Sequence, residues 1–272
     1  MDADVSLDQR ERGDSTPFAD LNELLVKLVA GATEVLGDNF CGAYLQGSFA
    51  VGDADAYSDV DFIVVTGDEV TPEQQAELQA LHQALYALPT PWAQHLEGSY
   101  IPREVLRRPD PVRRPLLYLD NGATEFALDN HDNTAVVRWS LREHGVLLAG
   151  PDPRELLDPI TADELRDEMR WALGLWREWF RSIDSISRRA LAVAVLSHAR
   201  ILHTLAIGEV SSKRVAGEWA LDALDPEWAS LIRWALDDRP DPWSKVHEPA
   251  DPALLRRTRQ FIDYAARWAA DQ

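Results

Sequence analysis

Two short segments of the chain carry side chains that could bind a metal ion and a phosphate together. The segment at 58–61 reads Ser-Asp-Val-Asp, and the pair at 47–48 reads Gly-Ser. Side chains two residues apart on a β-strand point to the same face, so Asp59 and Asp61 would present two carboxylates, which is what magnesium prefers to share with substrate phosphates. A glycine lets the backbone approach closely, and the Ser48 hydroxyl with nearby N–H groups can hold phosphate oxygens. Either segment alone is common as a solvated strand or a turn; together they predict a metal-phosphate site.

The elements around these segments decide whether the two can meet. Residues 46–57 have no regular period and are predicted to form a loop, and residues 59–65 alternate as a strand that turns Val60 and Phe62 into the core. The other predicted elements of this half are helices at 18–36, 71–88 and 134–144, and strands at 40–45, 94–101, 116–120, 124–128 and 146–148. The first half is therefore predicted to be mixed α/β.

The clearest break in the pattern is the Gly-Pro-Asp-Pro stretch at 150–153, which neither a helix nor a strand can continue. Beyond it a Thr-Ala-Asp-Glu capping box at 161–164 opens a stretch whose apolar residues keep a helical period to the end. We predict three parts: a disordered leader at 1–16, a mixed α/β domain at 17–150 and an all-helical domain at 151–272.

Composition limits the possible partners. The chain of 272 residues has 46 acidic and 27 basic side chains, a net charge of −19, which disfavours a nucleic-acid partner and favours a cationic one. No apolar run of membrane-spanning length is evident, and the polar start of the chain lacks the features of a secretory signal. Cys41 is the single cysteine, so no disulfide can form within the chain. We expect a cytoplasmic monomer that binds no membrane.

This part of the chain contains, in order, a strand, a Gly-Ser pair, a loop, a Ser-Asp-x-Asp segment and an apolar strand. That order resembles the active-site signature of the polymerase-β-like nucleotidyltransferase superfamily. The third carboxylate of that superfamily lies on a later strand, where this chain has Glu97 on the face opposite Leu96. Motifs of P-loop, Rossmann, nucleophile-elbow and zincin proteins are absent from the sequence. The resemblance implies an α+β fold, with an N-terminal polymerase-β-like nucleotidyltransferase domain (a mixed sheet with helices) followed by a C-terminal α-helical bundle.

Most of the chain also resembles the streptomycin/spectinomycin adenylyltransferases, the aminoglycoside (3'')(9) type. Residues 142–151 resemble the passage between the two domains of that family. The serines at 48 and 58 have the ten-residue spacing of its nucleotide-contacting serines, and residues 212–220 resemble the stretch that brings basic side chains to the ATP phosphates. The resemblance implies that ATP is the co-substrate and that these residues hold it: Gly47, Ser48, Ser58, Arg200 and Lys213.

The resemblance is weaker where the acceptor would bind. Trp176 resembles a family tryptophan near the substrate, whereas residues 107–115 are rich in arginine and proline and offer no counterpart of a second one. An acidic residue expected before the helix at 134 is matched by Asp132, although strict register places Asn133 there. We therefore expect Asp132 and Trp176 to contact the acceptor.

The reaction implied by the resemblance is attack of an acceptor hydroxyl on the α-phosphate of ATP, with release of pyrophosphate. Two magnesium ions would be held by Asp59, Asp61 and Glu97, and Glu97 would take the hydroxyl proton. A small cationic acceptor is expected, streptomycin and/or spectinomycin, so that the protein would confer antibiotic resistance. Two alternatives stay open: an enzyme of this fold with a non-antibiotic or protein acceptor, and a catalytically silent nucleotide-binding module, against which the three carboxylates argue.

Overall fold

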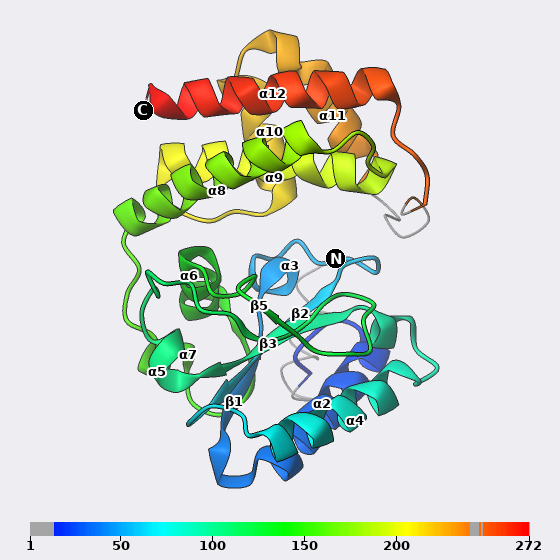
Figure 1. Cartoon of the computed structure of the whole chain (residues 1–272), viewed down its shortest axis with the longest axis vertical. Coiled ribbons are helices and arrows are strands. Elements are labelled where there is room, and N and C mark those ends of the chain that lie inside the picture. Colours follow the sequence, from blue (N-terminus) through cyan, green and yellow to red (C-terminus); the bar gives the residue numbers. More distant parts are fainter. Residues whose placement is uncertain (1–13, 240–244, 246, 272) are drawn as a thin grey trace, which may run out of the picture. The chain divides into compact units, whose positions relative to one another are not determined.

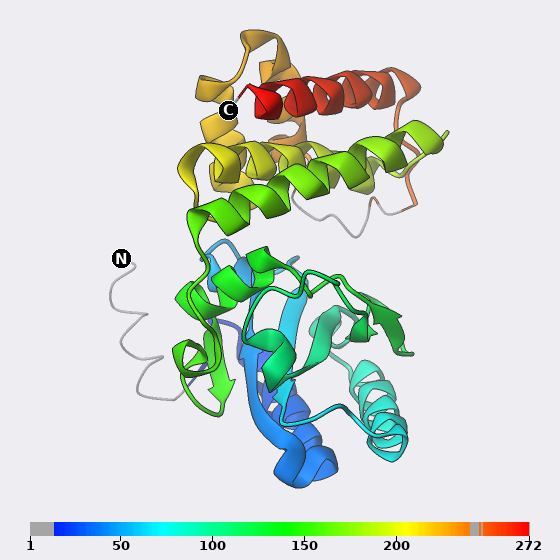
Figure 2. The same ribbon diagram turned by 60° about the vertical axis from the view of Figure 1, so that its left-hand side comes forward.

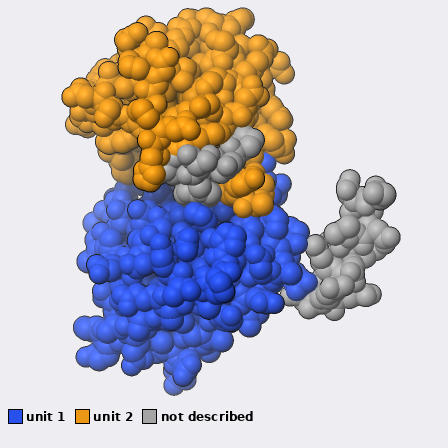
Figure 3. All heavy atoms as spheres, turned by 90° about the vertical axis from the view of Figure 1, so that its right-hand side faces the viewer, with its two compact units in different colours: residues 1–54, 58–159 blue, residues 55–57, 160–272 orange. Residues whose placement is uncertain are grey.

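The computed structural model describes residues 14–239, 245 and 247–271. Two compact units make up the chain: residues 1–54 with 58–159, and residues 55–57 with 160–272 (Figure 3). We expected the domain boundary at Gly150. Residues up to Pro159 instead belong to the first unit, because Leu156 and Leu157 are buried there in one cluster with Ile63.

The N-terminal leader expected over 1–16 lies mostly outside the described residues. Its last residue, Thr16, is 4% exposed, and its backbone N–H donates to Asn22 Oδ1 at 3.0 Å. Thr16 is therefore part of the first unit.

The first unit is built on one six-stranded mixed sheet with strand order β5-β4-β3-β2-β1-β6. Figures 1 and 2 show this sheet from two directions. Only β2 and β3 pair in parallel; every other neighbouring pair is antiparallel. The strands are β1 (Phe40–Leu45), β2 (Val60–Thr66), β3 (Leu96–Pro102), β4 (Leu116–Leu119), β5 (Ala127–Asp129) and β6 (Val146–Ala149). All six strand predictions are confirmed, with bounds shifted by at most three residues.

Helices cover both faces of this sheet. On one face, α2 (Ala19–Leu36) and α4 (Pro72–Tyr86) bury Val60 and Phe62, as the alternation predicted. On the other face, Ile63 and Val65 are buried in a second cluster that includes side chains of α5 (Arg103–Leu106), α6 (Ala135–His144) and α7 (Pro153–Leu156). Strand β2 is thus buried on both sides beyond Asp61, which is typical of a strand with a parallel neighbour.

Three one-turn helices were not predicted. The most important, α3 (Gly47–Ala50), lies within the segment 46–57 that we expected to be a loop, and α5 and α7 were also missed. A single turn has too few residues to show a helical period, so periodicity cannot find it. By contrast, the capping boxes at Thr71 and Thr161 both form and start long helices.

Every regular element that the structure describes in the second unit is a helix, as predicted. The unit contains α8 (Ala162–Ser182), α9 (Arg188–Ile207), α10 (Lys213–Ala223), α11 (Ala229–Asp237) and α12 (Pro252–Ala270). Helix α9 contacts each of the other four. By length and composition α9 could cross a membrane, contrary to our expectation that no segment could, but 67% of its most apolar stretch is buried by the surrounding helices. Its apolar character is that of a core helix.

Candidate functional site

A polar strip crosses one face of the sheet in the first unit. Asp61 in β2 and Glu97 in β3 are direct partners in the parallel register, so their side chains share one face of the sheet. Asp59 lies immediately before β2, two residues from Asp61. Ser99 follows Glu97 on the same face by the period of two. The structure thus brings the three predicted carboxylates to neighbouring positions.

Gly47 and Ser48 form the start of α3, at the end of β1. The backbone N–H of Gln46 donates to the carbonyl oxygen of Asp61 at 2.9 Å, which ties this turn to β2. Gly47 has a φ of +60°, and a Cβ at this position would lie 1.9 Å from Asp61 Oδ2. Only glycine allows the backbone to pass so close to the carboxylate.

The Ser48 hydroxyl is buried and makes no hydrogen bond to any residue that the structure describes. A buried hydroxyl without a partner costs free energy, so a ligand oxygen at this place would relieve that cost. Ser58, on the far side of the loop, is half-buried. The turn at 47–48 therefore has the features expected of a phosphate cradle: a glycine, a short helix start and an unpaired hydroxyl.

Glu97 is mostly buried, with a side chain 13% exposed. The Tyr118 hydroxyl donates to its Oε1 at 2.6 Å, and His131 Nε2 lies 3.5 Å from the same oxygen. Burial raises the pKa of Glu97 above its ordinary value; Tyr118 and His131 oppose that rise, and the nearby Asp59 adds to it. A carboxyl group with a raised pKa is suited to accepting a proton.

Asp132 is a fourth carboxylate at this site and is 2% exposed. Its Oδ2 accepts from the Ser99 hydroxyl at 2.7 Å, and its Oδ1 accepts from Gln46 Nε2 at 3.3 Å. Burial raises the pKa of Asp132 to about 6, and the charge of Asp61 contributes to the rise. Asp132 therefore belongs to the same electrostatic cluster as the predicted metal ligands.

The neighbouring Asn133, which strict register favoured, has a structural role. Its Oδ1 accepts from the buried Arg138 guanidinium at 2.6 Å, and its Nδ2 donates to the carbonyl oxygen of Arg114 at 2.9 Å. Of the two candidates, only Asp132 is in contact with the polar strip through its side chain.

The raised pKa of Asp132 predicts a measurable pH dependence of stability. In the unfolded chain an aspartate titrates near 3.8 and in the folded protein near 6, so this group favours folding most below pH 4, and that contribution is lost as the pH rises through 6. The loss is on the order of 2–3 kcal/mol. Asp132→Asn should remove this pH-dependent loss. The free energy of unfolding of the variant minus that of the wild type should therefore increase from pH 4 to pH 8. Urea unfolding in buffer with a metal chelator measures this; a difference that does not change with pH would contradict it.

Among the described residues, no three His, Cys, Asp or Glu side chains are grouped so that they alone could hold a metal ion. Magnesium usually keeps several waters and is bound by one or two carboxylates together with substrate phosphates. Asp59, Asp61 and Glu97 fit that mode, because the phosphate cradle at 47–48 adjoins Asp61 and would complete the ligand set.

The remaining predicted site residues belong to the helical unit. Arg200 is on α9 and Lys213 is the first residue of α10; both are half-buried. The positive end of a helix dipole and a lysine at the same place favour an anion there. The structure describes each unit by itself, so a contact between these two residues and the carboxylates stays a prediction.

Trp176 packs inside the helical unit. Its ring stacks on Phe180 at a centroid distance of 5.9 Å and meets His198 edge-on at 5.6 Å. The more open aromatic side chains of α8 are Trp171, 40% exposed, and Trp179, 45% exposed. A ligand contact by Trp176 stays a prediction, and Trp171 and Trp179 offer more accessible aromatic surface.

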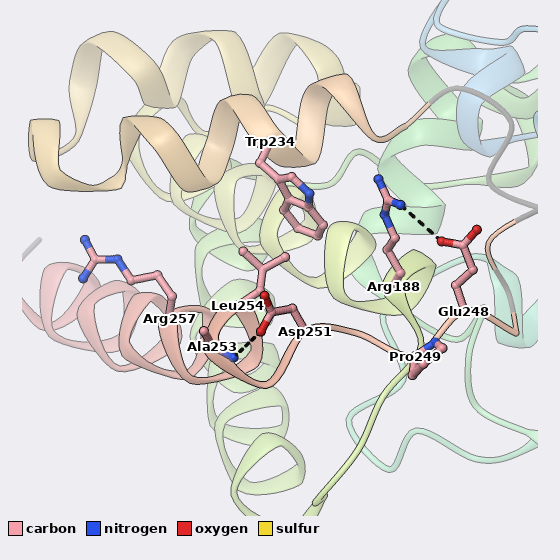
Figure 4. A pocket seen from close by; sticks show the side chains of 8 residues that line it. All are labelled: Arg188, Trp234, Glu248, Pro249, Asp251, Ala253, Leu254 and Arg257. Atoms are coloured by element: carbon pink, nitrogen blue, oxygen red, sulfur yellow. Dashed lines mark hydrogen bonds and ion pairs between the residues drawn. The ribbon is translucent and has the colours of Figure 1, made fainter.

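The helical unit also has a pocket of about 580 Å³, lined in part by Trp234 and Leu254 (Figure 4). Its charged side chains already have partners. Arg188 Nη1 lies 3.2 Å from Glu248 Oε2, and Asp251 Oδ1 accepts from the N–H of Ala253 at 2.7 Å. None of the predicted site residues lines this pocket, so the chemistry is assigned to the polar strip and not to the pocket.

Sequence reasoning missed four residues of the site: Gln46, Ser99, Tyr118 and His131. Strand alternation places Ser99 on the same face as Glu97, and Ser99 could therefore have been predicted from the sequence. The other three depend on the strand register or on the course of a loop, which the sequence does not specify.

Comparison with known proteins supports the same assignment. Residues 41–114 match the family model described as nucleotidyltransferase domain, and residues 155–262 match the model described as aminoglycoside adenylyltransferase, C-terminal domain.

Curated relatives extend over most of the chain. A spectinomycin 9-adenylyltransferase of Staphylococcus aureus is 27% identical over 250 residues, which is 85% of this chain and 90% of that protein. The protein of the same name from Campylobacter jejuni is 23% identical, over 89% of this chain and 95% of its own length. An aminoglycoside (3'') (9) adenylyltransferase of Klebsiella pneumoniae is 29% identical over 36% of each chain.

Solved structures with a similar fold include the following one. It is a spectinomycin adenyltransferase of Enterococcus faecialis, crystallised with ATP and spectinomycin, and it matches with a TM-score of 0.68 at 16% identity. The match covers 91% of this chain and 98% of that one, so both units have counterparts.

Proposed function

We infer that this chain, which belongs to the aminoglycoside adenylyltransferase family of nucleotidyltransferases, transfers AMP from ATP to a hydroxyl group of a small cationic acceptor. The observation that carries this proposal is the strip of carboxylates beside the Gly47-Ser48 turn. Asp61 and Glu97 are register partners, and the turn approaches Asp61 closely enough to require glycine. The arrangement supports a place for a nucleotide phosphate next to acidic side chains.

The proposed roles follow from position. Asp59 and Asp61, with Glu97 beside them, would hold two magnesium ions, which neutralise charge on the attacking and leaving oxygens when bound. Gly47 and Ser48 would hold phosphate oxygens through the backbone and the unpaired hydroxyl, and Ser58 would add a second hydroxyl.

Glu97 would accept the proton of the attacking hydroxyl. The acceptor oxygen then forms a bond to the α-phosphorus, the bond to pyrophosphate breaks, and the proton moves to the Glu97 carboxylate. The acidic residues of the first unit, Asp132 among them, suit an acceptor that carries positive charge.

Spectinomycin is our proposed first acceptor, with streptomycin as the second. Two of the full-length relatives are spectinomycin 9-adenylyltransferases, and the net charge of −19 favours a cationic small molecule over a nucleic acid. Such an enzyme would protect a cell from the antibiotic and would work as a monomer in the cytoplasm.

Transfer of radiolabel from α-labelled ATP to a panel of spectinomycin, streptomycin and other aminoglycosides, with magnesium present, tests the proposal. Labelled product with a panel member and none after chelation of the metal is the expected result. Label on a co-purified protein instead would support the protein-acceptor alternative. Binding of ATP without any transfer would support the silent module.

The helical unit provides a separate prediction. Lys213→Ala should weaken ATP binding by about 10- to 100-fold, since it removes one charge-assisted contact to a phosphate. Isothermal titration calorimetry with Mg-ATP measures the effect. Arg214→Ala is the matched control, because Arg214 is the next residue, is exposed and pairs with Glu218 at 3.2 Å. If both variants bind Mg-ATP as tightly as the wild type does, Lys213 is only a charge on the helix and makes no contact with a phosphate.

A further inference from the structure

The catalytic carboxylate proposed above is held by a phenol from the neighbouring strand. Strands β3 and β4 pair antiparallel with Ser99 opposite Tyr118, so the Tyr118 side chain lies on the face that carries Glu97. The Tyr118 hydroxyl donates to Glu97 Oε1 at 2.6 Å and lies 3.1 Å from Asp120 Oδ1. A hydroxyl has one hydrogen to donate, so the shorter contact, to Glu97, is the one it favours.

This phenol is itself held in place. Tyr118 is 6% exposed, and the ring of His131 stacks on it with centroids 5.3 Å apart and an interplanar angle of 26°. His131 Nε2 also approaches Glu97 Oε1, at 3.5 Å. These two contacts, from Tyr118 and His131, are therefore both made to the same carboxylate oxygen, Oε1.

We propose that Tyr118 is a positioning residue that fixes Glu97 through Oε1 and so presents Oε2 to the acceptor hydroxyl. The inference rests on the proposed function, in which Glu97 takes the proton as the acceptor oxygen bonds to the α-phosphorus and pyrophosphate leaves. The proton goes to Oε2, and the Tyr118 hydroxyl keeps its own hydrogen throughout.

The physical reason lies in the strength and direction of this contact. A hydroxyl-to-carboxylate hydrogen bond of this length is charge-assisted and about twice as strong as a neutral one. A carboxylate on a glutamate side chain has several rotatable bonds, and misplacing a catalytic group by about 1 Å can cost about 100-fold in rate. Tyr118 removes that freedom by holding one of the two oxygens.

Tyr118→Phe is the direct test. We expect kcat for AMP transfer to spectinomycin to fall by about 10- to 100-fold, while the affinity for Mg-ATP by calorimetry stays within a factor of two. Tyr100→Phe is the matched control. Tyr100, in β3, is a buried phenol like Tyr118, but its hydroxyl lies 2.9 Å from His82 Nε2, and its side chain packs in the core cluster on the opposite face of the sheet. The control should keep wild-type kcat, and thermal midpoints of both variants report on folding.

A double-mutant cycle separates positioning from a general structural effect. If Tyr118 acts through Glu97, adding Tyr118→Phe to Glu97→Gln should cause no further loss of the residual turnover. The inference would be overturned, with the proposed function left standing, by either of two results. One is a further loss of turnover in the double variant as large as the loss that Tyr118→Phe causes in the wild type. The other is an unchanged kcat in Tyr118→Phe while Glu97→Gln is inactive. Wild-type turnover by Glu97→Gln would overturn both the proposed role of Glu97 and this inference.

Discussion

Asp61→Asn is expected to lose metal-dependent AMP transfer by roughly 10³-fold or more while keeping the native fold, and Asp59→Asn is expected to do the same. A metal ion contributes several kcal/mol of charge stabilisation to a phosphoryl-group transition state, and each 1.36 kcal/mol is a factor of ten in rate. The change from carboxylate to amide removes the ligand charge at nearly constant shape. Asp61 is placed between the Gly47 backbone and Glu97, so its amide would stand where magnesium and phosphate are proposed to meet.

The measurement is initial rate against magnesium concentration at saturating ATP and spectinomycin, with circular dichroism as the test of folding. Asp68→Asn is the matched control, because Asp68 is exposed and lies just beyond the opposite end of the same strand, β2. It should behave as wild type. A near wild-type rate for Asp59→Asn or Asp61→Asn would remove that residue from the proposed metal site.

Most of the fold could be predicted from local sequence patterns. Alternation found β2, and a capping box with proline found the start of α4, because both depend on residues within a few positions of each other. The one-turn α3 and the continuation of the first unit to Pro159 were not predictable in this way. They depend on tertiary contacts, such as those that bury Leu156 against the sheet.

The site residues also differ in whether local sequence patterns can predict them. Asp59 and Asp61 are two residues apart, so the period of a strand is enough to place them together. Placing Glu97 beside Asp61 requires the β2–β3 register, which the sequence supplied only through a family resemblance. Tyr118 requires a second register as well, and nothing in its local sequence distinguishes it from an ordinary strand tyrosine.

The choice between Asp132 and Asn133 shows the limit most clearly. Strict register favours Asn133 of these two adjacent polar residues, and the spacing does not show which of the two side chains faces the site. The structure separates them, because Asp132 accepts from Ser99 while Asn133 accepts from the buried Arg138. Which way each side chain points depends on the course of the loop between β5 and α6, and therefore on partners distant in the sequence.

Glu97→Gln is expected to bind Mg-ATP with near-normal affinity and to lose roughly 10²- to 10⁴-fold in turnover, the usual contribution of a general base. The two roles proposed for this carboxylate predict different failures. Loss of a base would stop chemistry and leave binding intact, because Asp59 and Asp61 would still hold the proposed metal. Loss of an essential metal ligand weakens the binding of Mg-ATP.

Calorimetry with Mg-ATP and single-turnover rates with spectinomycin distinguish these outcomes. Glu104→Gln is the control, since Glu104 is exposed on α5, directly after β3. Amide at position 97 can still accept a hydrogen bond from Tyr118 but cannot take a proton, so the fold and the nucleotide site should survive. If Glu97→Gln abolishes Mg-ATP binding, Glu97 is chiefly a metal ligand. If turnover stays at the wild-type rate, the base must be another carboxylate, and Asp132, buried in the same strip with a pKa raised to about 6, is the next residue to substitute.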